Sequence, residues 1–203
     1  MTHSNHRRGT YANLSNDYVV LFVPGRIMED LAARVEQFVN ICRRHRPVNR
    51  DYPGGWYAYA YDSKEKITGV LKDLVDADLR LSVVVSGLFH EVKECCCAAG
   101  TFPHTVNHSL GFWGKEDKLP HERILEFTTM CGHGLVSSNL VYHLAKKVQR
   151  HAMSIGDAVQ GMERPCFCNI FNPVRAEELL RKLVADLEAG ILSEADLNLP
   201  GLT

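Results

Sequence analysis

The sequence has no long hydrophobic run and no strong charge of either sign. No apolar stretch reaches the roughly 18 residues that a membrane-spanning helix needs, so we expect no membrane partner. With 23 Lys and Arg against 24 Asp and Glu, the net charge of −1 provides no basic field for nucleic acid. The first ten residues, MTHSNHRRGT, lack the apolar core of a signal peptide, so we expect a cytoplasmic protein.

The short motifs that usually identify a site are also absent. The sequence contains neither the paired C-x2-C of zinc ribbons nor the HExxH of zinc proteases. It also lacks the ferredoxin spacing of cysteines, which argues against a pure electron carrier. No G-x-G-x-x-G, Walker or G-x-S-x-G loop is present, so the sequence does not indicate a substrate.

Hydrophobic periodicity predicts an α/β fold. The run DYVVLFVPG reads as a buried strand, and the helical spacing of Ile27, Leu31 and Val35 follows it. Ser63 is a suitable N-cap, and Gly100 a suitable helix stop. The expected strands are 17–25, 56–62, 80–87 and 104–113, and the expected helices are 26–45, 63–79, 88–99, 121–131, 134–150, 155–163 and 173–189.

The chain is long enough for one good hydrophobic core. Its 203 residues are 45% hydrophobic and 23% charged, as in ordinary globular proteins. Strand–helix alternation over the first ~113 residues followed by helices alone predicts one α/β domain over residues 1–203. We expect residues 1–15 to be flexible and residues 120–203 to be mainly helical.

Cysteine is the unusual feature. Six of the seven cysteines fall in three short islands: EVKECCCAAG, TTMCGHGLVS and RPCFCNIFNP. The seventh, Cys42, lies in an apolar helical pattern and is expected to be a core residue. Since cytosolic thiols stay reduced, the islands favour metal binding or catalysis over disulfides.

Helical geometry separates the three thiols of the first island. Cys95 falls on the apolar stripe with Val92, which predicts a packing role. Cys97 lies on the opposite side, and Cys96 lies between the two. We therefore expect Cys96 or Cys97 to face a site. The alternative interpretation is that all three are small apolar residues that end a helix.

The other two islands lie at helix breaks. Cys131 is flanked by Gly132 and Gly134, and we expect the amides of the following helix to favour its thiolate. Cys166 and Cys168 form a C-x-C pair, which rarely closes into a disulfide because the geometry is strained. Two thiolates on one irregular stretch suit a polynuclear site, or one ligand with a bystander. We expect Asn169 and Asn172 to donate hydrogen bonds to bound sulfur or oxygen.

Three histidines lie close to these islands in the sequence. His104 and His108 share one face at a spacing of four residues, and His133 follows Cys131 by two. We predict that His133, His104 and His108 line the same pocket as the thiols and transfer protons there. The odds are against direct metal ligation by His104 and His108, because HxxxH alone is a weak signal.

The distribution of cysteines over three separate islands predicts an iron–sulfur centre that takes one thiolate from each island. We expect Cys131, one of Cys96 and Cys97, and one of Cys166 and Cys168 to hold a [4Fe–4S] cluster with one open iron. Such an iron is a Lewis acid for a small-molecule substrate, which indicates a lyase, dehydratase or reductase. Zinc at the same thiols is the alternative cofactor, and a redox sensor without turnover is the alternative class. Monomer and homodimer both stay open.

The stretch MCGHG, residues 130–134, resembles the first catalytic-cysteine motif of the proline racemase and diaminopimelate epimerase superfamily. In that superfamily one cysteine abstracts an α-proton and a second works from the opposite face. The resemblance covers five residues, and PCFCN differs from the superfamily's Cys-Gly-Thr loop. It implies a reactive thiol at Cys131, with Cys166 or Cys168 as its partner. A metal-free racemase-like or thiol-transfer enzyme is therefore a further hypothesis.

Overall fold

The computed structural model describes residues 7–23, 29–50, 57–107 and 109–200. These residues form two compact units. The sheet unit contains residues 11–106 and the short segment 168–172, and the helical unit contains the remainder. The prediction of one domain over residues 1–203 stays a prediction. Of the predicted flexible stretch 1–15, residues 1–6 lie outside the described residues, and the first helix occupies 11–14.

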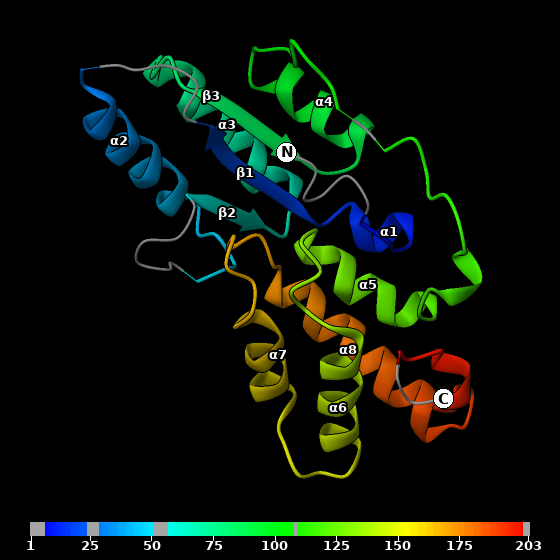
Figure 1. The fold of residues 1–203 in the computed structure, drawn as a ribbon. Helices are drawn as coiled ribbons and strands as arrows, with labels where there is room; N and C mark the ends of the chain where they lie inside the picture. Colours follow the sequence, from blue (N-terminus) through cyan, green and yellow to red (C-terminus); the bar gives the residue numbers. More distant parts are fainter. Residues whose placement is uncertain (1–6, 24–28, 51–56, 108, 201–203) are drawn as a thin grey trace. The chain divides into compact units, whose positions relative to one another are not determined.

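The sheet unit is built on three antiparallel strands (Figure 1). Strand β1 lies in the centre of the order β2-β1-β3, with Val20 opposite both Tyr59 and Val85. The chain alternates strands and helices, so the α/β class is confirmed. The elements are α1 (Tyr11–Leu14), β1 (Tyr18–Val23), α2 (Leu31–Arg44), β2 (Ala58–Tyr61), α3 (Lys64–Ala77), β3 (Ser82–Ser86) and α4 (Phe89–Ala98).

One face of this sheet carries the core of the unit. Alternate residues of β1 and β2 pack against apolar side chains of α2, α3 and α4, because successive strand residues point to opposite faces. Ser63 caps α3 as predicted, accepting a hydrogen bond from the Lys66 amide. The core cluster includes Tyr18, Val20, Phe22, Phe38, Ile41, Cys42, Tyr59, Tyr61, Ile67, Val70, Leu71 and Cys95.

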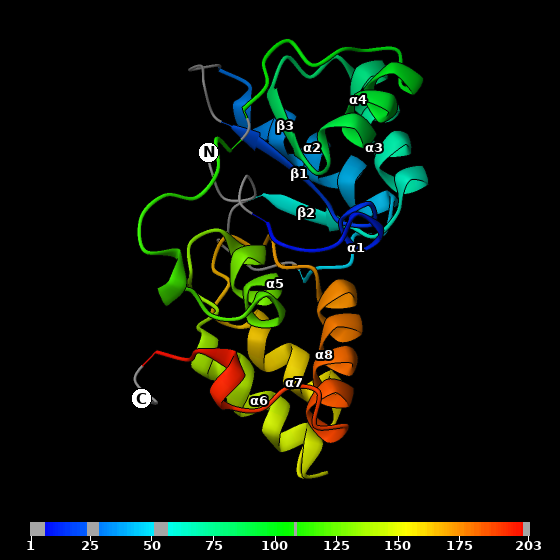
Figure 2. The same ribbon diagram turned by 90° about the vertical axis from the view of Figure 1, so that its right-hand side faces the viewer.

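The helical unit contains the predicted C-terminal helices. In Figure 2 the helices α6, α7 and α8 lie side by side, and α5 contacts both α6 and α8. Their inward-facing residues follow the helical repeat, for example Leu179, Leu180 and Leu183 on α8. The elements are η1 (Glu116–Lys118), α5 (Glu122–Cys131), α6 (Ser138–Gln149), α7 (Ile155–Glu163), α8 (Pro173–Glu188) and η2 (Ala195–Leu197).

The prediction of a strand over residues 104–113 is wrong. Residues 104–107 and 109–113 belong to no helix or strand, and residue 108 lies outside the description. Gly111 adopts a φ of 114°, which the extended strand conformation does not allow. Two large apolar side chains of this stretch, Leu110 and Trp113, are exposed.

Candidate metal centre

The first cysteine island lies on α4. Cys95 packs in the core of the sheet unit, as predicted, and Cys96 belongs to the same core cluster. Cys97 is exposed, on the side that also exposes His90 and Glu94. Burial, and then the neighbouring thiols Cys95 and Cys97, raise the pKa of Cys96. The free thiol of Cys96 is therefore held protonated, and its role as a metal ligand stays a prediction.

The second island is the C-terminal end of α5. Cys131 is the last residue of the helix and is fully buried, while His133 is exposed. Gly132 ends the helix in the left-handed conformation, with a φ of 75°. The last carbonyl oxygens of a helix have no hydrogen-bond partner within the helix, and the negative end of the helix dipole lies there. Both features favour a nearby cation.

The following helix begins later than predicted. α6 starts at Ser138, where the Ser137 hydroxyl caps it by accepting a hydrogen bond from the Leu140 amide at 3.2 Å. Gly134, predicted as the first residue of this helix, instead has a φ of 67°. The prediction that the helix begins just after Cys131 is therefore wrong, and the effect of its amides on the Cys131 thiolate stays a prediction.

The third island connects α7 to α8. The amide of Cys166 donates to the Glu163 carbonyl at 2.9 Å, so the chain leaves α7 through a tight turn. Cys166 and Cys168 are both buried, and Phe167 between them is exposed. All seven cysteines lie within the description, and none of them forms a disulfide.

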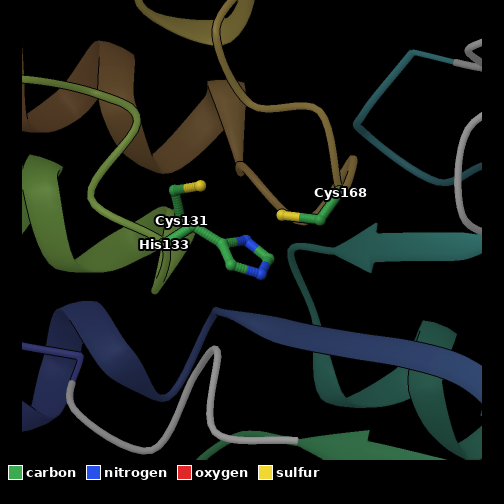
Figure 3. Close-up of side chains that lie close together, drawn as sticks. All are labelled: Cys131, His133 and Cys168. Carbon is green, nitrogen blue, oxygen red and sulfur yellow. The ribbon is translucent and has the colours of Figure 1, made fainter.

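Three of the predicted site residues come together. The Sγ atoms of Cys131 and Cys168 and a ring nitrogen of His133 all lie within 4.8 Å of one another. In Figure 3 the two sulfurs point toward each other, and the imidazole of His133 lies beside them. Cys166, two residues before Cys168, is not part of this group. Within the described residues, this is the one group of three or more Cys, His, Asp or Glu side chains with that spacing.

The donor set suits one metal ion. Zinc binds Cys sulfur at about 2.3 Å and His nitrogen at about 2.0–2.1 Å, so two tetrahedral ligands stand roughly 3.4–3.8 Å apart. The observed limit of 4.8 Å exceeds this spacing by about 1 Å, which small side-chain rotations can supply. Two sulfurs and one imidazole are also the ligands that zinc takes in sites with an open fourth position.

Among the described residues, the other predicted site residues do not belong to this group. His104 is exposed, and its Nδ1 hydrogen-bonds with the Thr105 hydroxyl at 3.0 Å. His108 lies outside the described residues. Cys96 and Cys97 lie on α4, as stated above. Their participation in a common centre, and that of His104 in a common pocket, stays a prediction.

Two buried asparagines hold the segment that carries Cys168, and the sequence indicated neither role. Asn49, between α2 and β2, donates from Nδ2 to the Asn169 carbonyl at 2.6 Å. Asn172 donates from Nδ2 to Asp17 Oδ1 at 3.0 Å, and its role as a donor to bound sulfur or oxygen stays a prediction. Nothing in the sequence around Asn49 distinguishes it from a loop residue.

Comparisons with known proteins identify no family. No protein-family model matches the chain, and neither the curated proteins nor the solved structures contain a match. The racemase resemblance of MCGHG therefore remains limited to those five residues. None of the helices in the described part of the chain has the length and hydrophobicity that crossing a membrane requires.

Proposed function

We propose that this protein binds one transition-metal ion, preferably Zn²⁺, through Cys131, His133 and Cys168. The observation that carries the proposal is the convergence of two buried thiols and an imidazole within 4.8 Å. Two thiolates at that distance repel each other, and a divalent cation removes the repulsion. The C-terminal end of α5 at Cys131 also favours a cation, because the helix dipole places partial negative charge there.

A [4Fe–4S] cluster is the second candidate. It is favoured by Cys166, which adds a third buried thiol two residues from Cys168. Two considerations place it behind a single ion. The cysteines of a cubane bind different irons, so their sulfurs stand farther apart than two ligands of one ion. The usual protein ligands of that cluster are cysteines, whereas His133 supplies nitrogen here.

The proposed site suits a catalytic ion. Three protein ligands leave one position of a tetrahedral ion for water or substrate. The exposure of His133 opens the site to solvent on the imidazole side, whereas both sulfurs are buried. An ion held in this way acts as a Lewis acid and lowers the pKa of bound water. We therefore propose an enzyme that acts on a small molecule by metal-assisted addition, elimination or hydrolysis.

Metal analysis of the protein tests this proposal. We would purify the chain without oxygen and measure zinc, iron and acid-labile sulfide per chain. The proposal expects one zinc ion and no sulfide, and each of Cys131→Ser, His133→Ala and Cys168→Ser should lose the ion. Cys97→Ser and His104→Ala are matched controls, because both replace exposed residues outside the group.

The alternatives give different results in the same measurement. Iron with equal sulfide, lost on Cys166→Ser as well, would replace the zinc proposal by the cluster. A chain that takes up neither zinc nor a cluster when reconstituted would overturn both and favour the metal-free thiol enzyme. Zinc that stays bound after any of the three ligand substitutions would remove that residue from the site.

A further inference from the structure

The segment that carries Cys168 has no regular structure of its own. Residues 168–172 belong to no helix or strand and connect the exposed Phe167 to the start of α8. Asn169 adopts a left-handed φ of 61°. A thiol on such a segment loses conformational entropy when it binds a metal, unless other contacts already fix the backbone. The contacts that fix it are therefore part of the site.

Asn49 bonds to the residue next to Cys168. Its side chain is buried, and Nδ2 donates to two carbonyls: Asn169 at 2.6 Å and Ala58 at 2.9 Å. Oδ1 accepts from the Ala60 amide at 2.7 Å. Both amide hydrogens are used, and the pattern of two carbonyls and one N–H fixes which atom is nitrogen. The bond to Asn169 fixes the residue directly after Cys168.

Asn49 is held on its other side by backbone groups of the sheet. Ala58 and Ala60 belong to β2, whose opposite edge is paired with β1. The amide of Val48 also donates to the Ala60 carbonyl, at 2.8 Å. Asn49 therefore bonds to the edge of β2 that faces away from β1, as the backbone of a neighbouring strand would. Through its bond to Asn169 it links segment 168–172 to the sheet.

We infer that Asn49 is a positioning residue that sets the place of the Cys168 thiolate for metal binding. The inference rests on the proposed metal site at Cys131, His133 and Cys168. The buried Asn49 amide bonds both to β2 and to segment 168–172, and it therefore restricts the position of Cys168 before a metal ion binds. Groups that orient metal ligands in this way typically change metal affinity by about 10–100-fold when they are replaced.

Asn49→Asp tests this role with little change in size. The carboxylate can still accept from the Ala60 amide, but it places negative charge against the carbonyls of Ala58 and Asn169. Co²⁺ serves as the probe, because its thiolate charge-transfer absorption reports how many sulfurs bind and in what geometry. We expect about a 10–100-fold loss of Co²⁺ affinity, with weakened thiolate absorption that approaches the spectrum of Cys168→Ser.

Two controls separate positioning from folding. Asn198 also donates from Nδ2 to two carbonyls, those of Asp117 and Leu119, so Asn198→Asp makes the same chemical change away from Cys168. Phe38→Leu lowers the stability of the sheet unit without touching segment 168–172. Both should keep the affinity and the spectrum of the original protein. Should Asn49→Asp fail to fold, Asn49→Ser removes the same two donor bonds with a neutral side chain and is judged by the same criteria.

The outcomes distinguish this inference from the proposed function. If the original protein shows no thiolate–Co²⁺ absorption, the metal site itself fails. If it binds Co²⁺ and a folded Asn49 variant binds with the same affinity and spectrum, the positioning role is overturned. The positioning role is also overturned if Phe38→Leu, at the same stability as the Asn49 variant, loses as much Co²⁺ affinity.

Discussion

Zinc binding at the proposed site should release about two protons per ion near neutral pH. Each sulfur binds as a thiolate, whereas an ordinary cysteine, with a pKa of about 8.5, is mostly protonated at pH 7. Cys131 and Cys168 would therefore each lose about one proton.

The proton count sets the pH dependence of the affinity. Two released protons make the apparent association constant rise about a hundredfold per pH unit below the thiol pKa. That factor corresponds to about 2.7 kcal/mol of binding free energy per pH unit. The affinity for zinc should therefore fall steeply as the pH drops from 8 to 6.5.

Calorimetric titration in two buffers with different ionisation enthalpies measures the count directly. Cys168→Ser should reduce the release to about one proton, with weaker binding, because one thiolate is removed. Cys166→Ser should leave it at about two. A release of three protons that falls to two on Cys166→Ser would refute the ligand set, and a release near zero would refute thiolate ligation altogether.

Two further predictions concern the sheet unit. Phe38 is fully buried, with its ring 5.6 Å from that of Phe22, so Phe38→Ala should lower the free energy of unfolding by about 3–5 kcal/mol; a denaturant midpoint that does not move would contradict this packing. Glu91 accepts hydrogen bonds from Lys64 at 2.7 Å and from Tyr11, and these bonds lower its pKa. Its contribution to stability is present above the ordinary glutamate pKa and is lost as the pH falls through the lowered value. Lys64→Met should therefore reduce the loss of stability on acidification below about pH 4.3, measured by thermal melts at several pH values; equal acid sensitivity in both proteins would contradict it.

Local signals predicted most of the fold. The apolar run at 17–25 and the alternating aromatics at 56–62 contain β1 and β2, because strand patterns depend on nearby residues alone. The same reasoning failed over residues 104–113. A strand was predicted there, but a strand forms only where a partner edge offers hydrogen bonds, and Gly111 has a backbone conformation that strands do not use.

The candidate site could be predicted only in part. Cysteines beside Gly132 and Pro165 indicated loops and helix ends, and two of these thiols, Cys131 and Cys168, lie together with His133. The sequence could not select Cys168 over Cys166, since both thiols are buried and lie two residues apart on the same irregular segment.

The sequence by itself determined the α/β pattern, the helix cap at Ser63, the helix stop at Gly100 and the burial of Cys95, because each depends on residues within a few turns of one another. Only the tertiary structure decided the antiparallel strand order, the group of Cys131, His133 and Cys168, and the bond from Asn49 to Asn169. The residues that make these contacts are far apart in the chain, so which of them meet depends on how the elements pack, and no local pattern records that.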